Sequence, residues 1–375
     1  MSLTEDIKDF ALDLGYSKVG ITSADDFADY VQEVNSRYDM YAWFAESPRR
    51  ILEGAHPRNI SAPAKSIIAL VHDYSKEAFP EELTGKIGRL YQARAYRAPE
   101  HRINGARHRL MEEFLRRNGC TVAVGPDRPE RLAAARAGVV NYGKNTFAFA
   151  EDIGSFIVLS SFLVDAELAY DEPSIEVDCP PNCTMCIEAC PTGALYEPLK
   201  MNPLRCIAFY TFHARDEAWK GVTSYIPPKV REKMGTWIHG CDICQEVCPR
   251  NRRRLRANLP ADEFLAKIAQ DFELTELLNM TDEFYEKIVQ PLMYNYIRDR
   301  KYFQRNAAIA LGNTGDQAVV GDLSRAMENP EEMVRGYAAW ALGRIGGRRA
   351  KQVLEKSLAL EKSEWVSSEI KSAFA

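Results

Sequence analysis

Apolar and polar positions in the first 165 residues follow helical and strand patterns in turn. Near the N-terminus an apolar face recurs at helical spacing, at Ile7, Phe10, Ala11 and Leu14. A second helix is predicted over 105–117, and compact apolar runs predict strands over 18–22, 66–71, 121–124 and 156–164. Helices alternating with buried strands indicate a layered α/β domain over residues 1–165.

Residues 166–260 have a different pattern. They contain most of the cysteines and many prolines, and few long periodic runs. Such a segment buries little apolar surface on its own, so we expect bound metal to stabilise a separate domain over 166–260.

Residues 261–375 follow a helical pattern throughout and contain a 31-residue repeat. Five residues of one helix recur 31 positions later: Ala308, Ala310, Leu311, Gly312 and Gly315 return as Ala339, Ala341, Leu342, Gly343 and Gly346. The pattern resembles HEAT-type repeats, whose small residues let paired helices pack closely. Two copies are too few for an independent solenoid, so we expect this third domain to dock on the rest of the chain.

Composition narrows the class of protein. Apolar residues make up 46% and charged residues 27% of the 375 residues, which excludes wholesale disorder. The longest nearly apolar stretch, 153–164, is too short to span a membrane, and no secretory signal is apparent, so a cytoplasmic location is expected.

The net charge and the distribution of basic residues do not decide which partners the protein binds. The net charge of −5 excludes a uniformly basic nucleic-acid coat. Basic residues do gather locally, with nine Lys and Arg against three Glu over 86–117 and five arginines over 250–256. These patches could contact RNA phosphates or a cofactor, or they could be solvated faces.

Eight of the nine cysteines lie between Cys179 and Cys248. Their spacing is C-x3-C-x2-C-x3-C-P followed by a lone cysteine and then C-x2-C-x3-C-P, close to the bacterial ferredoxin run, in which the last cysteine binds the other cluster. We therefore assign one 4Fe–4S cluster to Cys179, Cys183, Cys186 and Cys248. A second cluster is assigned to Cys206, Cys241, Cys244 and Cys190.

Structural zinc sites are the alternative, because C-x2-C pairs also suit zinc. The repeated Cys-Pro ending and a cysteine count that matches two clusters favour iron and sulfur. Cys179 lies one residue earlier than the usual spacing, and Cys120 is expected to be a buried apolar residue rather than a ligand.

The motifs taken together resemble the cobalamin-dependent epoxyqueuosine reductases, relatives of the reductive dehalogenases. The similarity covers nearly the whole chain and includes 64–74, 133–145, both cysteine motifs (189–195 and 240–245 most closely) and the HEAT-like end. It implies two 4Fe–4S clusters that pass electrons to the Co(I) state of a base-off cobalamin in the N-terminal domain. The best-known members reduce epoxyqueuosine to queuosine in tRNA.

The resemblance also implies site residues, with departures. Where the family carries an aspartate this chain has Val124, and Asp127 lies three residues away, whereas the family's glutamate aligns with Glu130. Candidate proton donors are Glu130, His101 and Tyr142; the alternatives are an exposed histidine at a helix start and a tyrosine of the core. Cofactor contacts are assigned to the segment Asn141, Gly143, Lys144 and Asn145, and a solvated turn is the alternative for Lys144.

We therefore predict a cobalamin-dependent iron–sulfur reductase that resembles epoxyqueuosine reductase. It would receive electrons from a flavodoxin- or ferredoxin-type donor and act on tRNA. Because Val124 stands where the family carries an aspartate, one alternative is a paralogue that reduces another substrate. A third hypothesis is an electron-transfer protein that serves a corrinoid partner.

Overall fold

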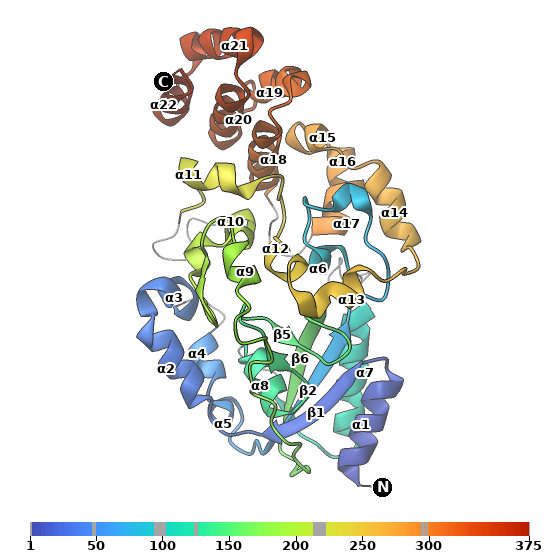
Figure 1. Ribbon diagram of the computed structural model, residues 1–375. Coiled ribbons are helices and arrows are strands. Elements are labelled where there is room, and N and C mark those ends of the chain that lie inside the picture. Colours follow the sequence, from blue (N-terminus) through green and yellow to red (C-terminus); the bar gives the residue numbers. More distant parts are fainter. Residues whose placement is uncertain are drawn as a thin grey trace.

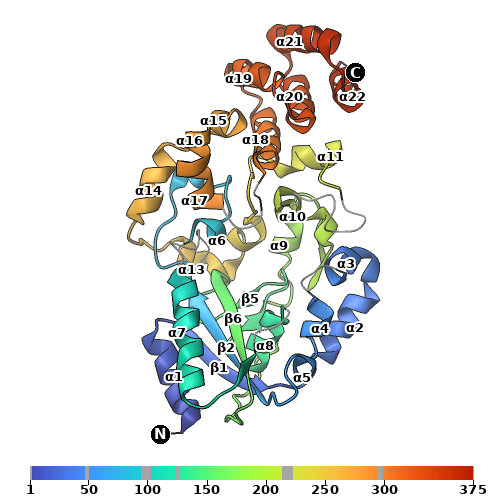
Figure 2. The same ribbon diagram turned by 180° about the vertical axis from the view of Figure 1, so that it is seen from behind.

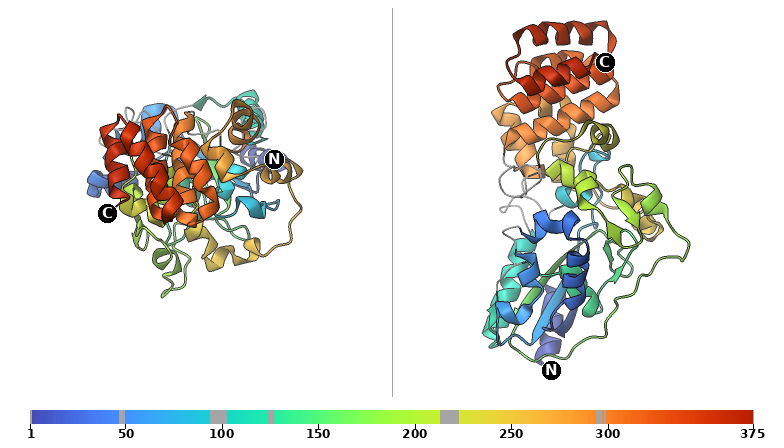
Figure 3. Two further views of the ribbon diagram at one scale, coloured as in Figure 1. Left: turned by 90° about the horizontal axis from the view of Figure 1, so that it is seen from above. Right: turned by 90° about the vertical axis from the view of Figure 1, so that its left-hand side faces the viewer.

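The computed structural model describes residues 2–46, 50–93, 103–123, 127–212, 223–293, 297 and 299–374. The molecule is elongated, with a sheet at the N-terminal end, short elements in the middle and packed helices at the C-terminal end (Figures 1 and 3). None of the described helices combines the length and the apolar character needed to cross a membrane.

The N-terminal sheet has four strands in the order β1–β2–β6–β3, and every neighbouring pair is antiparallel. Their bounds are β1 (Lys18–Ser23), β2 (Ser66–Asp73), β6 (Ile157–Val164) and β3 (Val122–Ala123). All eight residues of β2 are buried, because the strand lies between two others and is covered on both faces. This explains why its sequence is a nearly continuous apolar run. All four predicted strands are present.

Helices cover both faces of this sheet (Figure 2). Ile68 and Leu70 of β2 pack with α1 (Leu3–Asp13) and α7 (Ile103–Arg117), whereas Ala69 and Val71 pack with α8 (Glu130–Arg136). Alternate residues of a strand point to opposite faces, so one apolar strand serves two cores. α1 begins with a capping box, in which the Ser2 and Glu5 side chains each accept from the other's backbone N–H.

Four short helices lie between β1 and β2: α2 (Ala28–Ser36), α3 (Tyr38–Ala45), α4 (Ile51–Gly54) and α5 (Pro57–Ile60). A small hairpin of β4 (Asn141–Tyr142) and β5 (Ala148–Phe149) follows α8 and leads toward the middle of the molecule. The residues between its strands form a tight turn, closed by the Gly143 N–H on the Phe147 carbonyl at 2.9 Å.

The middle region has only short elements. They are α6 (Arg89–Gln92), α9 (Met185–Glu188), β7 (Leu195–Glu197), β8 (Lys200–Met201), α10 (Ile207–Phe212), α11 (Pro228–Arg231), α12 (Ile243–Glu246) and α13 (Arg252–Leu255). Helices α9 and α12, which contain Cys186 and Cys244, pack against each other. Elements of four residues have little stability alone, so their neighbours must hold them.

The C-terminal region is a stack of helices. It contains α14 (Glu263–Gln270), α15 (Leu274–Leu278), α16 (Asp282–Phe284), α17 (Gln290–Met293), α18 (Arg300–Thr314), α19 (Val320–Ala326), α20 (Glu332–Ile345), α21 (Gly347–Leu360) and α22 (Glu364–Ser372). The predicted repeat places α18 against α20, and a Cβ built on Gly312 would lie 2.9 Å from the Ala341 Cα. Gly315 and Gly346 end the two helices at φ of 68° and 69°, where a side chain is disfavoured.

The helical region docks on the middle region through buried polar groups, as expected. The guanidinium of Arg305, which is fully buried in α18, donates to the backbone carbonyls of Ser224 at 2.6 Å and Tyr210 at 2.9 Å. The neighbouring Asn306 amide donates to the carbonyls of Thr211 and Ile238. Backbone groups that the irregular middle region cannot pair internally are thus paired from outside.

Candidate functional site

Four of the predicted ligands come together around α9 and the segment that follows α12. The pKa of the Cys186 thiol is raised to about 11, first by burial and then by the nearby thiols of Cys248, Cys179 and Cys183. The pKa of Cys248 is raised by burial and also by Cys179. We call these four residues the first cysteine set.

The other four predicted ligands form a second group. Burial raises the pKa of Cys241 and of Cys244, and for both thiols Cys206 and Cys190 contribute in the same direction. The pKa of Cys206 is likewise raised by burial and by Cys190. These residues are the second cysteine set, and none of the thiols that perturb them belongs to the first set.

Two groups of four thiolates are the ligand complement of two 4Fe–4S clusters. Within the described parts of the chain, no three His, Cys, Asp or Glu side chains are grouped to hold a single metal ion. Since burial favours the protonated thiols, metal binding at either set must release protons. The ninth cysteine, Cys120, lies in the apolar core beside α1 and α7.

A cavity of about 320 Å³, here called the central cavity, separates the sheet from the second cysteine set. Its walls come from the ends of β2 and β6, from α6, from the start of α8, from the β4–β5 hairpin and from the second cysteine loop. The lining residues are Tyr74, Leu90, Tyr91, Glu130, Arg131, Phe147, Ala148, Ser155, Ile157, Val158, Leu159, Ala208, Cys241, Asp242 and Gln245. Apolar side chains with a few convergent polar groups are typical of a small-molecule site.

Of the predicted proton donors that the structure describes, Glu130 lies in this wall and Tyr142 does not. It is half-buried at the start of α8, and its Oε1 accepts from the Ser161 hydroxyl at 3.0 Å. Burial raises the pKa of its carboxyl, against the opposing effects of Arg128 and of the Ser161 hydrogen bond. A carboxyl group in this setting keeps its proton at a higher pH than an exposed one.

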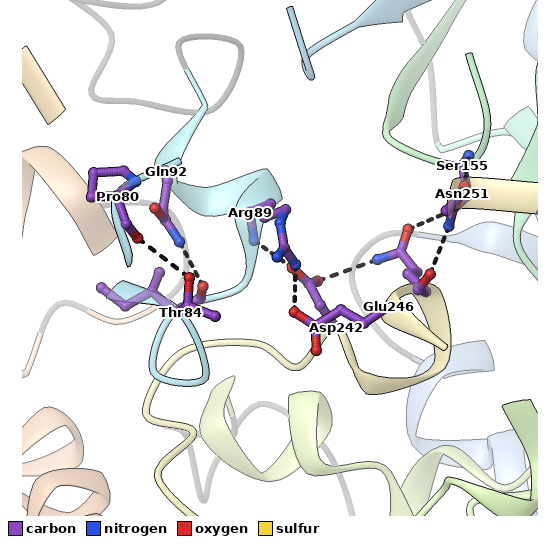
Figure 4. A network of polar contacts seen from close by, with 10 residues as sticks. Pro80, Thr84, Arg89, Gln92, Ser155, Asp242, Glu246 and Asn251 are labelled. Carbon is purple, nitrogen blue, oxygen red and sulfur yellow. Dashed lines mark hydrogen bonds and ion pairs between the residues drawn. The ribbon is translucent and has the colours of Figure 1, made fainter. Parts of the chain in front are cut away.

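Buried ion pairs fix the second cysteine loop to the cavity wall. The Asp242 carboxylate, between Cys241 and Cys244, accepts from the Arg89 backbone N–H at 2.8 Å and from its guanidinium at 3.2 Å. The same guanidinium contacts Glu246 at 2.6 Å, as Figure 4 shows. Asp242 is only 4% exposed, so removing Arg89 would leave a buried charge unpaired.

The candidate cofactor contacts and Tyr142, all within the described parts of the chain, lie outside the cavity wall. Tyr142 does not line it; its ring is half-buried and packs with the alanines of α8. Asn141 accepts from the Arg250 guanidinium at 2.6 Å, and Gly143 lies where a Cβ would be 2.4 Å from the Phe149 ring. Lys144 and Asn145 contact the two cysteine loops instead. His101 and position 124 lie outside the described residues.

Most residues of the wall were not predicted from the sequence, and two of them, Tyr74 and Asp242, are polar and buried. Tyr74 directly follows the buried strand β2 and is 8% exposed, and burial together with the nearby Asp242 raises the pKa of its phenol. Tyr74 and Asp242 both lie in segments that resemble the family, 64–74 and 240–245. Tyr74 is a polar residue at the end of a buried strand, and Asp242 is an acidic residue between two cysteines. Such positions could have indicated a site, although the apolar pattern does not.

Two family models match the chain. One describes a 4Fe–4S double cluster binding domain over residues 179–251 and the other describes HEAT repeats over 290–375. With the mixed α/β N-terminal region, they confirm the predicted fold class.

Similar proteins match over nearly the full length. An epoxyqueuosine reductase of Bacillus subtilis is 32% identical over 383 residues, which cover 98% of this chain and 94% of the relative. One from Bacillus anthracis is 30% identical, covering 98% and 96%. Among solved structures, the B. subtilis enzyme with its catalytic loop swung out of the active site has a TM-score of 0.81 at 30% identity, covering 99% and 98%. An epoxyqueuosine reductase with an epoxyqueuosine-modified tRNA stem loop has a TM-score of 0.80 at 29% identity, covering 99% and 97%.

Proposed function

The chain belongs to the epoxyqueuosine reductase family of oxidoreductases, and from this premise we propose that it reduces epoxyqueuosine to queuosine in tRNA. The observation that carries the proposal is the central cavity, whose lining includes both the Glu130 carboxyl group and Cys241 of the second set. A proton donor and an electron source would then face one cavity. Because tRNA is the substrate, we assign the reaction to the cytoplasm.

Electrons would reach the cavity from two 4Fe–4S clusters, one held by each cysteine set. The second set is the proximal one, since Cys241 lines the cavity wall and no member of the first set does. The packing of α9 against α12 brings the two sets close together. An external donor of the flavodoxin or ferredoxin type would supply the first set.

The cavity also suits one side of a corrin. Leu90, Phe147 and Val158 give it apolar walls for a flat ring, whereas Arg131 and Gln245 offer polar groups to peripheral amides. Its volume lies at the lower end of the range for small-molecule sites, so the described walls would enclose only part of a cobalamin. When bound, reduced cobalamin supplies a strong nucleophile and electron carrier.

Glu130 is the proposed proton donor of this reaction. Removal of an epoxide oxygen as water consumes two electrons and two protons, and the C–O bonds break as the oxygen is protonated. Burial raises the pKa of the Glu130 carboxyl, so it would retain its proton to a higher pH than an exposed carboxyl, and the Ser161 hydroxyl holds its orientation. General acids of this kind contribute on the order of 10²- to 10⁴-fold in rate.

The tRNA would be bound by exposed basic residues near the cavity. Of the arginines over 250–256, Arg250 and Arg254 are committed to Asp178 and Asp73, whereas Arg252, Arg253 and Arg256 are exposed. Exposed arginines gain affinity from phosphates in a salt-dependent way. The solved relative with a tRNA stem loop supports a nucleic-acid substrate.

Anaerobic turnover tests the proposal. Iron-containing protein is incubated with cobalamin, dithionite and tRNA that contains epoxyqueuosine. It should convert this nucleoside to queuosine, and nucleoside mass spectrometry measures the conversion. Omitting cobalamin should stop conversion. No conversion by protein with intact clusters and bound corrinoid would contradict the substrate and favour a paralogue, whereas no corrinoid uptake would favour an electron carrier.

A further inference from the structure

The tip of the β4–β5 hairpin lies between the two cysteine sets. Two consecutive residues of its turn reach in different directions. Lys144 contacts the loop that carries Cys179 and Cys183, and the Asn145 amide donates to the backbone carbonyl of Cys244 at 3.2 Å. One turn from the N-terminal region is therefore bound to the loops of both sets.

The Lys144 ammonium is held by three backbone carbonyls. It donates to Pro180 at 2.9 Å, to Pro181 at 2.7 Å and to Cys183 at 3.1 Å. An ammonium has three donors, and here each meets one carbonyl. The two prolines have no N–H, so this loop has few backbone donors of its own. Within it the Cys183 N–H donates to the Pro180 carbonyl at 3.0 Å, and the Lys144 side chain supplies the further donors.

The backbone of the same residue reaches the first set directly. The Lys144 N–H donates to the Cys179 sulfur at 3.4 Å. The segment that leads into Cys179 is also fixed to the hairpin, because the Tyr142 N–H donates to the Glu176 carbonyl and the Asp178 N–H to the Tyr142 carbonyl. The segment that leads into Cys179 therefore runs beside β4, and Cys179 itself lies next to Lys144.

The turn is built so that both contacts form together. Asn145 is 2% exposed. Its side-chain oxygen Oδ1 accepts from the Phe147 N–H at 3.2 Å, and its side-chain amide nitrogen donates to the Cys244 carbonyl. A Cβ on Gly143 would lie 2.7 Å from that oxygen, so the turn needs glycine there.

We propose that Lys144 is a positioning residue for the cluster of the first set, and that its charge raises the reduction potential of that cluster selectively. The inference rests on the proposed iron–sulfur function. Reduction adds negative charge to a cluster, and a nearby fixed cation stabilises the reduced form. Hydrogen bonds to the ligating sulfurs act in the same direction, and Lys144 supplies one of these as well.

The test is an anaerobic redox titration of the full chain, followed by electron paramagnetic resonance, with iron content measured alongside. Lys144→Met removes the charge and the three donated bonds, and Lys144→Arg retains the charge. The matched control is Lys200→Met. Lys200 lies in the same region, with its side chain 46% exposed, and pairs with Glu197 rather than with a cysteine loop.

Lys144→Met should lower one of the two midpoint potentials, or lose the iron of one cluster, and leave the other cluster unchanged. A tenfold smaller equilibrium constant for one-electron reduction corresponds to a shift of about 59 mV. Lys144→Arg should lie nearer the unaltered protein, and Lys200→Met should match it. Unchanged potentials in Lys144→Met, or equal effects on both clusters, would overturn the proposal.

These readouts need neither tRNA nor corrinoid, so they separate this inference from the function it rests on. Normal, Lys144-dependent potentials with no nucleoside conversion would leave the positioning role intact and contradict the substrate. Nucleoside conversion together with cluster potentials that do not change in Lys144→Met would support the substrate and contradict the positioning role.

Discussion

The middle region and the C-terminal helices are built on opposite principles. In the C-terminal region, α18, α20 and α22 pack through small and apolar residues, and their backbone groups pair within each helix. In the middle region the elements are short, and backbone carbonyls are paired by side chains from outside: Lys144 donates to carbonyls near the cysteines, and Arg305 donates to those of Ser224 and Tyr210. The two regions also share one apolar core, which includes Ile226 and Trp237 of the middle region. The middle region therefore depends on its neighbours, and we expect it to depend on bound metal as well.

The buried ion pair between the two regions illustrates the difference. Arg231 of α11 makes paired contacts with the Glu369 carboxylate of α22, at 2.7 and 2.8 Å. Both side chains are nearly buried, at 3% and 11% exposed. Such a pair fixes the geometry of the joint but adds less stability than its contacts suggest, because both charges lose water. This pair therefore positions the middle region together with the apolar core that the two regions share.

Removal of one cysteine ligand from the middle region should have the largest effect. Cys244→Ala should abolish turnover and reduce iron from about eight toward about four per chain, because the second cluster loses one of its four thiolate ligands. Cys120→Ala, at the buried cysteine of the N-terminal core, is the control and should keep its iron. Full iron and activity in Cys244→Ala would rule out the second set as ligands.

Replacing the proposed acid should have the next largest effect. Glu130→Gln keeps the size of the side chain and removes its proton, so turnover should fall on the order of 100-fold or more. Cluster content should not change. A variant with normal turnover would exclude Glu130 as the donor.

The pH dependence should identify the same group. Burial raises the pKa of Glu130 in the folded protein, so activity that needs the protonated carboxyl is present below that pKa and is lost as pH rises through it. The folded state also holds this proton more tightly than the unfolded chain, so stability falls over the same window as pH rises. Both trends should be absent in Glu130→Gln; their persistence would assign them to another residue.

Iron removal should distinguish the two regions. After chelation, amide hydrogen exchange should speed up over 179–251 because the ligand loops lose their constraint, whereas α18 and α20 should keep their protection. Equal loss of protection in both would show that the helices also depend on metal.

The smallest effect is expected within the helices. Gly336→Ala would place a Cβ 2.1 Å from the Trp365 ring, and it should lower the free energy of unfolding by about 1–3 kcal/mol with iron unchanged. The control is Gly321→Ala in α19, where the nearest atom is 3.3 Å away at the end of the Arg349 side chain. That change should be neutral or slightly stabilising, as measured by chemical denaturation.

Sequence reasoning succeeded where one periodicity or one spacing carries the information. β2, α1 and the α18–α20 repeat each follow from a local pattern. The central cavity could not be predicted in this way, because its walls come from β2, α6, α8 and the second cysteine loop, and no local pattern brings these elements together. Lys144 was expected at a cofactor, but its reach into the Pro180–Cys183 carbonyls depends on how the hairpin meets another region.

The account depends most directly on what the eight thiols bind. Iron, acid-labile sulfide and zinc should be measured per chain in protein purified without oxygen. We predict about eight iron and about eight sulfide with no stoichiometric zinc, as two 4Fe–4S clusters require. Zinc in place of iron, with no sulfide, would contradict the account.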